Sequence, residues 1–208
     1  MSTPRRVAVP PATRRAEICR TAARVIREKG FDATSVADIA RALKMTKAGL
    51  YHYFPSKEAL LFEIMTFGLE RVREEVIGPA LMITDPAERL RQLVVRHAQI
   101  TTRAQGAVAQ LFEETRALPP AHRKVIETEQ GVYVSLIRET LAELKAAGRL
   151  GRIDPAVAAF SIIGMILWLP RWFRSGGRLS EEQAANEMAN LALAAVLAPK
   201  TDARRKSR

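Results

Sequence analysis

Apolar residues recur every three or four positions between residues 34 and 60, which is the spacing of one helix face. The residues at this spacing are Val36, Ile39, Ala40 and Leu43. Ser35 precedes them and Asp38 follows it by three positions, which is the pattern of a capping box. The pattern therefore predicts a short helix that begins after Ser35.

A second short helix is predicted directly after the first. Lys44 and Met45 are expected to form the turn, and Thr46 can cap the new helix. Pro55 stops this helix, because the residue before a proline avoids the helical region of backbone conformation. Ser56 then caps a third helix. Two short helices joined by a tight turn form a helix-turn-helix, which makes DNA the first partner to consider.

Turn signals divide the rest of the chain into further helices. A first helix is expected at about 14–29, and a linking helix at about 57–77, where Gly78 and Pro79 are expected to stop it. Later helices are expected at about 85–103, in a short stretch ending at 118, and at about 119–147, 154–173 and 180–198. The prediction is an all-α chain with a three-helix head and a six-helix ligand-binding and dimerisation body.

The formal net charge of +11 is concentrated at the two ends of the chain. Residues 1–57 hold 12 Lys and Arg against 4 Asp and Glu, and residues 199–208 hold 5 against 1. Residues 58–198 hold 16 against 17. A basic head on a neutral body is typical of a nucleic-acid binder. The expected divisions are a disordered basic arm at 1–13, a DNA-binding domain at 14–57, a ligand-binding and dimerisation domain at 58–198, and a basic tail at 199–208.

The second helix of the pair carries side chains suited to DNA. The N-terminal residues of such a helix contact base edges in the major groove, and Lys47, Ala48 and Gly49 occupy its first turn. The aromatic residues that follow can donate to phosphates or can pack the small domain. The predicted DNA-binding residues are Arg14, Thr34, Ser35, Thr46, Lys47, Ala48, Gly49, Tyr51, His52, Tyr53 and Lys57.

This stretch resembles the N-terminal domain of the TetR family of one-component regulators. The helix at 14–29 is closed by Gly30, and the residues that follow in the family's order and spacing are Phe31, Thr34, Ile39, Ala40, Leu50, Tyr51, Tyr53, Phe54, Ser56, Lys57, Glu58 and Leu60. Ala48 and Gly49 depart from the pattern, because the family usually has Gly and then a small hydroxyl residue there. The resemblance implies an all-helical homodimer, usually a repressor, whose C-terminal domain binds a small molecule and moves the paired DNA-binding heads.

Residues 156–170 are almost all apolar. This run is shorter than the roughly 20 residues of a membrane span, so no membrane partner is expected. A helix that is apolar all round belongs in a core or an interface. Together with the last helix it is expected to pair with a second subunit as a four-helix bundle. The predicted interface residues are Ile162, Leu169, Met188, Leu191, Ala192 and Ala195.

Two tryptophans lie near three arginines between residues 168 and 180. This segment resembles the R-W-Y-R-P-G-G-x-L-[ST] segment of TetR-type regulators of fatty-acid and sterol-ring catabolism, which respond to acyl-CoA thioesters. Phe173 and Ser175 replace the Tyr and Pro of that segment. The implied effector has an apolar tail and a polyanionic head, bound by Arg171 and Trp172. Alternatively, Trp172 and Phe173 seal a dimer interface and the arginines are solvated.

Other residues of the middle helices can face a shared cavity or can be ordinary core. The full set of predicted effector-binding residues is Phe67, His97, Ile100, Phe112, Arg116, Tyr133, Leu136, Met165, Trp168, Arg171 and Trp172. No cofactor is implied. The single Cys19 is expected to be a small core residue.

Three other functions compete with that of an acyl-CoA-responsive repressor of a palindromic operator. An enzyme is not expected, because the histidines His52, His97 and His122 are far apart and no Gly-rich phosphate loop is present. A repressor that senses a hydrophobic drug and controls efflux has the same architecture. An effector-independent architectural protein is not favoured, because it does not need a body as large as residues 58–198. The N-terminus lacks the apolar run of a signal peptide, so a cytoplasmic location is expected.

Overall fold

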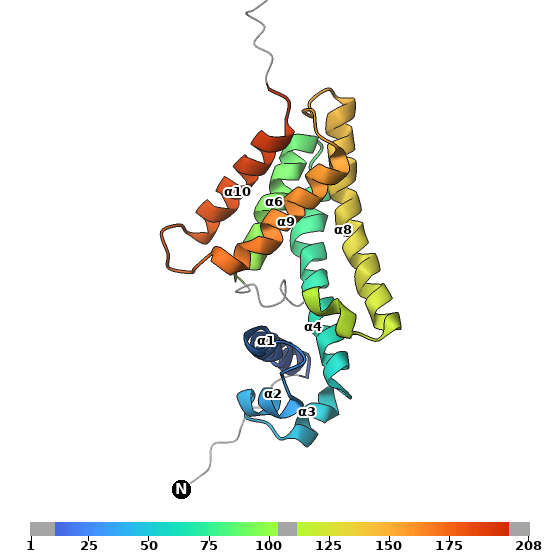
Figure 1. Cartoon of the computed structure of the whole chain (residues 1–208), viewed down its shortest axis with the longest axis vertical. Helices are drawn as coiled ribbons and strands as arrows, with labels where there is room; N and C mark the ends of the chain where they lie inside the picture. The colour runs from blue at the N-terminus through green and yellow to red at the C-terminus, as the bar shows by residue number, and fades with distance from the viewer. Residues whose placement is uncertain (1–10, 104–111, 200–208) are drawn as a thin grey trace, which may run out of the picture. The chain divides into compact units, whose positions relative to one another are not determined.

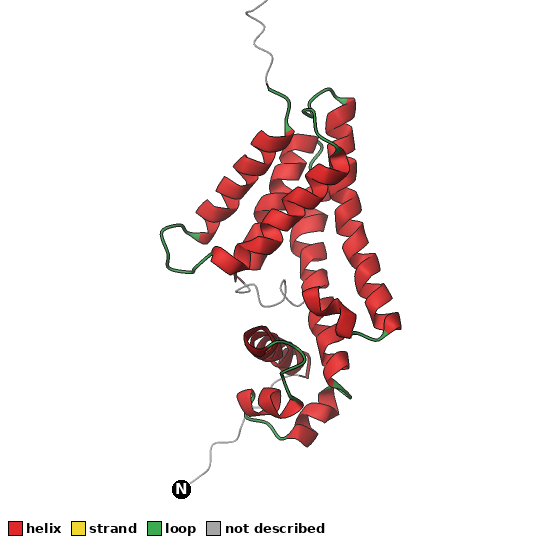
Figure 2. Cartoon of the chain, viewed as in Figure 1, coloured by secondary structure: helices red, strands yellow, loops and turns green. Residues whose placement is uncertain are grey.

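The computed structural model describes residues 11–103 and 112–199. Within these ranges the regular elements are helices (Figure 2), accompanied by one isolated bridge between Leu150 and Leu197. The predicted all-α fold class is therefore confirmed. Residues 1–10 of the expected basic arm and residues 200–208 of the expected basic tail lie outside the described residues, whereas residues 11–13, which were expected in the disordered arm, are helical.

The chain divides into two compact units. The first contains α1 (Pro11–Lys29), α2 (Val36–Ala42), α3 (Lys47–Tyr53) and the first part of α4 (Lys57–Val72), as labelled in Figure 1. It also contains the 3-10 helix η2 (Phe112–Ala117) and the start of α8 (Pro120–Ala146). This unit is larger than the predicted domain at 14–57, because Leu60, Leu61 and Ile64 of α4 are buried in it.

An aromatic contact ties the late segment into the first unit. The rings of Phe62 in α4 and His122 in α8 stack with centroids 4.1 Å apart and an interplanar angle of 13°. Leu118 and Ile126, which flank His122, are almost completely buried. These contacts join residues that are 60 positions apart, so periodicity along the sequence could not predict them.

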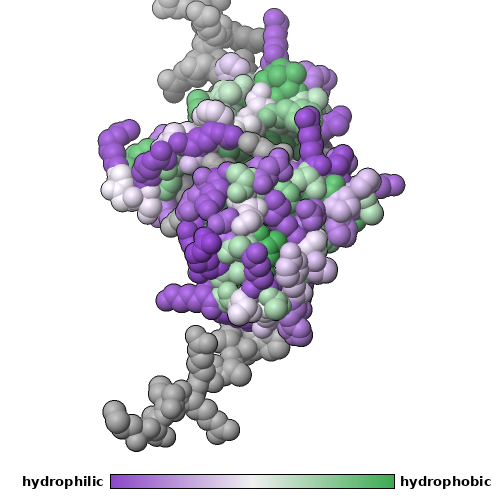
Figure 3. Space-filling view, turned by 60° about the horizontal axis from the view of Figure 1, so that its bottom comes forward, coloured by the Kyte–Doolittle hydropathy of each residue, from purple (hydrophilic) through white to green (hydrophobic). Residues whose placement is uncertain are grey.

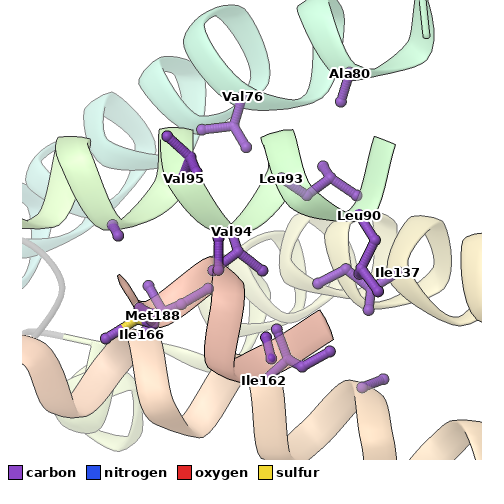
Figure 4. Close-up of a cluster of buried hydrophobic side chains, with 14 of the residues drawn as sticks. Val76, Ala80, Leu90, Leu93, Val94, Val95, Ile137, Ile162, Ile166 and Met188 are labelled. Atoms are coloured by element: carbon purple, nitrogen blue, oxygen red, sulfur yellow. The ribbon is translucent and has the colours of Figure 1, made fainter. Parts of the chain in front are cut away.

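The second unit contains the end of α4, the π-helix η1 (Arg73–Ile77), α5 (Gly78–Leu81), α6 (Pro86–Arg103) and the rest of α8. It also contains α9 (Pro155–Trp172) and α10 (Glu181–Val196). Helix α6 packs against both α9 and α10. Figure 4 shows the hydrophobic core that these helices share; its labelled residues are Val76, Ala80, Leu90, Leu93, Val94, Val95, Ile137, Ile162, Ile166 and Met188.

The linking helix does not stop at Gly78 and Pro79, which corrects the sequence prediction. Instead α4 passes into the π-helix η1, and helical structure continues through α5 to Leu81. The backbone N–H of Gly78 donates to the carbonyl of Arg73, five residues earlier. The wider π-turn places Pro79 at the start of a new short helix, where a proline without an N–H is tolerated.

The other predicted helix starts are confirmed by their caps. The Asp85 carboxylate accepts from the N–H groups of Ala87 and Glu88 at 3.0 and 2.9 Å. The Asp154 carboxylate caps α9 in the same way, and Ser180 forms a capping box with Gln183 at the start of α10. These caps fix where α6, α9 and α10 begin.

Helix α9 is apolar over its whole length. By length and composition it could cross a membrane, and it is the one helix of the described ranges for which this holds. Only 28% of its residues are buried within this chain. Its exposed apolar side chains include Val157, Phe160 and Trp168.

Candidate DNA-binding surface and effector pocket

The start of α2 is fixed by a complete capping box. The Asp38 N–H donates to Ser35 Oγ at 3.1 Å, and the Ser35 N–H donates to the Asp38 carboxylate at 3.0 Å. Lys29 and Arg41 also pair with Asp38, each at 3.1 Å. The hydrogen bonds from Ser35 and the nearby Lys29 hold the pKa of Asp38 far below its ordinary value. Ser35 is thus occupied in holding α2 in place.

A tight turn joins α2 to α3. Lys44 has a φ of 53°, a left-handed conformation that is uncommon for a residue other than glycine. The Met45 N–H donates to the Ala40 carbonyl at 2.9 Å, which closes the end of α2. The predicted turn at Lys44 and Met45 is confirmed.

Helix α3 begins at the predicted cap. Thr46 Oγ1 accepts from the Gly49 N–H at 3.0 Å. Leu50 lies in the core with 2% of its surface exposed, whereas Tyr51 is 49% exposed. The exposed residues of this helix and its cap are Thr46, Lys47, Ala48, Tyr51 and His52. The start of α3 therefore presents small, cationic and hydrogen-bonding groups to a partner.

Gly49 lies within the first turn of α3 and is only partly exposed. A Cβ atom at this position would lie 3.2 Å from Thr46 Oγ1 and 3.6 Å from the end of the Met45 side chain. A small side chain therefore requires a shift of a few tenths of an ångström and no rearrangement of the backbone. This makes position 49 suitable for testing the surface by substitution.

Lys57 has a structural contact that the sequence did not predict. Its ammonium donates to the carbonyls of Phe31 and Thr34 at 2.8 and 3.0 Å, and lies 4.1 Å from the centre of the Phe31 ring. It therefore joins the start of α4 to the loop between α1 and α2. Thr34 is 1% exposed and donates to the Gly30 carbonyl. This burial corrects the prediction that the Thr34 side chain contacts DNA.

Arginines of α1 also hold the unit together. Arg15 donates to the Tyr53 carbonyl at 3.2 Å and to the Glu63 carboxylate at 3.0 Å, with its guanidinium 4.6 Å from the Phe54 ring centre. It thereby fastens the end of α3 to α1 and α4. Arg14 pairs with Glu17 at 2.6 Å and remains partly exposed. An arginine one turn from the start of a helix gives no sequence signal for such a clamp.

One face of the chain is mainly hydrophilic. Figure 3 shows one face on which hydrophilic residues predominate and hydrophobic residues form small patches between them. Exposed basic residues of the first unit include Arg20, Arg24, Arg41, Lys44 and Lys47. Such a surface suits the polyanionic backbone of DNA.

The second unit has a groove between α9 and α10. Its volume is about 450 Å³, and its lining residues are Met165, Trp168, Trp172, Leu179, Ala184, Glu187, Met188 and Leu191. Met165, Trp168 and Trp172 are three of the residues predicted to bind an effector. The groove is lined by apolar and aromatic side chains with one carboxylate, which is the usual composition of a small-molecule site.

Arginines lie beside this groove. The Arg171 guanidinium is 4.4 Å from the centre of the Trp168 ring, and Arg171 is itself exposed. Arg174 donates to the carbonyls of Arg171 and Phe173 at 3.3 and 3.1 Å and so caps the end of α9. The predicted grouping of tryptophan with arginine is therefore present at the end of α9.

The remaining predicted pocket residues are not brought into this groove. His97 and Tyr133 contact each other in the core, with His97 Nδ1 3.0 Å from the Tyr133 hydroxyl. Burial lowers the pKa of His97 to about 4 and raises the pKa of Tyr133. Ile100 and Leu136 are part of the hydrophobic core. Phe67 and Arg116 belong to the first unit, and the Phe112 side chain lies outside the described part of the structure.

The predicted dimer residues divide by their exposure. Ile162, Leu169 and Ala192 are at most 1% exposed within a single chain, and Met188 is 8% exposed. Their side chains hold the core together and have almost no surface left for a partner, which corrects the prediction. Leu191 is 61% exposed, and Ala195 is also exposed. Sequence periodicity located the apolar helices but not the outer side of each.

Two further features limit the chemistry of the described residues. Cys19 is buried in α1, and desolvation raises the pKa of its thiol to about 12, so it is an unreactive core residue. Among residues 11–103 and 112–199, no group of three or more His, Cys, Asp and Glu side chains could hold a metal ion.

Comparisons with known proteins agree with this layout. The family described as bacterial regulatory proteins, tetR family, matches residues 18–64, and the Tetracyclin repressor-like, C-terminal domain matches residues 84–196. The crystal structure of AibR in complex with isovaleryl coenzyme A and operator DNA is 37% identical to this chain. It has a TM-score of 0.78 and covers 86% of this chain and 97% of that one.

Two other similar proteins are both named KstR2, and the first is described as a ketosteroid transcriptional regulator. The structure of KstR2 of Mycobacterium tuberculosis is 25% identical, with a TM-score of 0.81, and covers 93% of this chain and 100% of that one. The repressor KstR2 of Rhodococcus jostii (strain RHA1) is 27% identical over 199 residues, which cover 89% of this chain and 92% of the relative. Both similarities extend over the helix-turn-helix unit and the body.

Proposed function

This chain belongs to the TetR family of bacterial regulators, and on that premise we propose that it binds a palindromic operator as a homodimer and releases it when an acyl-CoA thioester binds. It is a ligand-responsive transcriptional regulator and not an enzyme. The proposal is carried by one observation. Both tryptophans of the chain line the groove between α9 and α10, with Arg171 beside them.

The start of α3 is the proposed DNA-reading surface. Lys47 and Ala48 are exposed on its first turn, where helix-turn-helix proteins contact base edges. Tyr51 and His52 are exposed further along and can donate to phosphates. Two such helices must lie about 34–36 Å apart to enter successive major grooves, which requires a dimer.

The exposed faces of α9 and α10 are the proposed dimer surface. Val157, Phe160, Gly164 and Trp168 of α9 are all exposed and recur at helical spacing. Leu191, Ala194 and Ala195 of α10 are likewise exposed. Small residues at Gly164, Ala194 and Ala195 allow close approach of two helices, so two copies can bury both stripes in a four-helix bundle.

The groove between α9 and α10 is the proposed effector site. Trp168 and Trp172 offer flat apolar surface for an acyl chain, and Arg171 offers a guanidinium for phosphate groups. The similar AibR structure contains isovaleryl coenzyme A. Trp168 and Leu191 also lie on the proposed dimer surface, whereas Trp172 and Leu179 belong to the groove alone. Variants at Trp172 therefore separate effector binding from dimerisation.

The DNA surface is tested at Gly49. Gly49→Asp places a carboxylate in the first turn of α3, where it repels phosphates but favours the helix dipole, so the unit should stay folded. We expect operator binding to be lost in a gel-shift assay. Gly49→Asn, which has the same shape without the charge, should retain binding to within about tenfold. Operator binding by folded Gly49→Asp protein at the wild-type affinity would contradict the assignment of α3.

The effector site is tested by the intrinsic fluorescence of the two tryptophans. Isovaleryl-CoA and longer acyl-CoA thioesters should change the tryptophan emission and release the operator, while free CoA and the free acids should do neither. Trp172→Leu should weaken the thioester response and leave operator affinity intact. Release of the operator by a thioester with unchanged emission would place the effector elsewhere.

A hydrophobic cationic drug is the second candidate effector. It is favoured by Glu187, the one carboxylate that lines the groove. In that case a cationic dye such as ethidium should change the tryptophan emission, and Glu187→Gln should abolish the change. Thioesters would then have no effect on operator binding.

A further inference from the structure

The second unit has another groove, beside α8. Its volume is about 300 Å³, and it lies between α8 and the stretch from the end of α4 through η1 to α5. Its lining residues are Leu69, Val72, Arg73, Ile77, Gly78, Leu81, Glu129, Val132 and Tyr133. It shares no lining residue with the groove between α9 and α10.

The walls of this groove are mostly aliphatic. Leu81 is 59% exposed and Val132 is 47% exposed, so apolar surface at its mouth faces solvent. Leu69, Val72 and Ile77 line it further in. A ligand that covers these side chains removes apolar surface from water, which favours binding.

The charged groups of the groove are already paired. Arg73 of η1 and Glu129 of α8 form an ion pair that spans the two walls. The two side chains are 60% and 37% exposed and pair with each other, so a charged ligand finds no unpaired group of opposite sign among the residues that line the groove. An uncharged ligand can bind while the pair stays closed, so the charge pattern favours an uncharged occupant.

The deepest residue of the groove is held rigidly. Tyr133 is 6% exposed, and its hydroxyl contacts the buried His97 at 3.0 Å. The Tyr133 hydroxyl is thereby engaged by the core, and its ring is what remains for a ligand. The site therefore offers an aromatic surface. The polar groups of Arg73, Glu129 and Tyr133 already have partners.

The π-helix η1 gives the groove its shape. Its wider turn is closed by the hydrogen bond from the Gly78 N–H to the Arg73 carbonyl, and both residues line the groove. A Cβ atom at position 78 would lie 3.4 Å from that carbonyl. Single π-turns inside α-helices are frequent at functional sites.

We propose that the groove between η1 and α8 is a second ligand site, for a compact uncharged apolar molecule such as a medium-chain alcohol. Its volume is at the lower end of the range of small-molecule pockets, roughly 300–1,000 Å³. The site is independent of the proposed acyl-CoA site, because the two grooves have no residue in common. It would let the regulator sense an uncharged apolar compound in addition to its effector.

The proposal is tested by titrating the full-length protein with 1-octanol in a calorimeter. Val132→Phe fills the groove and should weaken octanol binding by about tenfold or more, because a filled cavity has no room for the ligand. Val125→Phe is the matched control. Val125 lies on the same helix two turns earlier, is 48% exposed, and does not line the groove.

The mouth provides a second pair of variants if Val132→Phe does not fold. Leu81→Gln should weaken octanol binding, whereas Met82→Gln should not, because Met82 is 84% exposed and lies outside the groove. Octanoate and octylamine should bind more weakly than octanol. Equal octanol affinity in wild type, Val132→Phe and Leu81→Gln would overturn the proposal, as would absence of binding to the wild type.

A further readout separates this site from the proposed effector site. Both tryptophans line the groove between α9 and α10, so octanol bound beside η1 should leave their emission unchanged. A large octanol-induced change in tryptophan emission would place the alcohol in the effector groove and contradict the proposal. A failed response to acyl-CoA would leave the octanol result intact.

Discussion

Single basic residues in the first unit serve two different purposes. Lys47 is exposed at the start of α3 and is available to DNA. Lys57 and Arg15 instead donate to backbone carbonyls and pack against aromatic rings. These two contacts fasten α1, α3 and α4 to one another, so they fix how α3 is presented.

Substitution of Lys57 distinguishes a structural clamp from a phosphate contact. Lys57→Ala leaves the Phe31 and Thr34 carbonyls without their ammonium donor, which should cost about 1–3 kcal/mol of unfolding free energy. Operator affinity should fall, but the slope of log affinity against log salt should stay the same. The measurements are urea unfolding and operator binding between low and moderate salt.

Lys47→Ala is the matched control for Lys57→Ala. It should leave stability nearly unchanged and reduce the salt slope by about one, because it removes one phosphate-neutralising charge. A salt slope that falls by about one in the Lys57→Ala protein would show that Lys57 contacts phosphate after all.

The buried pair of His97 and Tyr133 makes stability depend on pH. The pKa of His97 in the folded chain is about 4, against 6.5 for an unperturbed histidine, because burial disfavours the charged ring. Between these values the unfolded chain binds a proton that the folded chain does not. The contribution of His97 to stability is therefore complete above pH 6.5 and decreases as the pH falls towards 4.

We expect this effect to amount to about 3 kcal/mol between pH 7 and pH 4. Unfolding free energy measured across this range should fall less steeply in His97→Gln, because glutamine does not titrate and can still contact Tyr133. The difference between the two proteins isolates His97 from the carboxylates that titrate in the same range. Parallel curves for wild type and His97→Gln would show that His97 has the same pKa in the folded chain as in the unfolded chain.

At the scale of elements, the turn between α2 and α3 decides where the reading helix points. The turn depends on Lys44 in a left-handed conformation that strains an L-residue. Glycine adopts this conformation without a Cβ clash and is the preferred residue after a helix end. The turn is therefore held by its surroundings and not by its own preference.

Lys44→Gly should raise the unfolding free energy by about 0.5–1 kcal/mol, because the strain is removed. The same substitution at Lys145, in the last turn of α8, should lower it by about 1 kcal/mol, because glycine weakens a helix. Thermal unfolding of both variants checks the prediction. A lower melting temperature in Lys44→Gly would show that the lysine side chain contributes more than the strain costs.

At the scale of the whole molecule, the outer face of α9 is the surface that we propose for dimerisation. Val157, Phe160 and Trp168 of this helix are each more than half exposed. An apolar stripe of this length on one helix is larger than the scattered apolar residues of an ordinary surface. A second copy of the chain can cover it, and the same pairing supplies the second DNA-reading helix.

Phe160→Glu should convert the proposed dimer to a monomer, because it places a charge in the apolar stripe. Operator affinity should then fall by about 100-fold or more, since the two half-sites are no longer held together. Val132→Glu, on a comparably exposed position of α8, should leave the dimer intact. Sedimentation of both variants measures the oligomeric state. A Phe160→Glu protein that remains a dimer would contradict the proposed interface, and so would binding of α9 to lipid vesicles.

Local signals in the sequence determined much of this protein. Capping residues at Ser35, Thr46, Asp85, Asp154 and Ser180 set helix starts, because their side chains bond backbone N–H groups within three residues. The helix-turn-helix is built from such short-range contacts, and its helices and turn could therefore be predicted from the sequence. The apolar character of α9 could also be predicted from the sequence, because it depends on composition alone.

Only the tertiary structure showed the contacts between residues that are far apart in the sequence. In it, Lys57 donates to the carbonyls of Phe31 and Thr34, more than 20 positions away, and the His122 ring stacks on Phe62. It converted the expected stop at Gly78 and Pro79 into a π-turn. It also decided which faces of α9 and α10 are buried, because both faces are apolar and only packing against α6 distinguishes them.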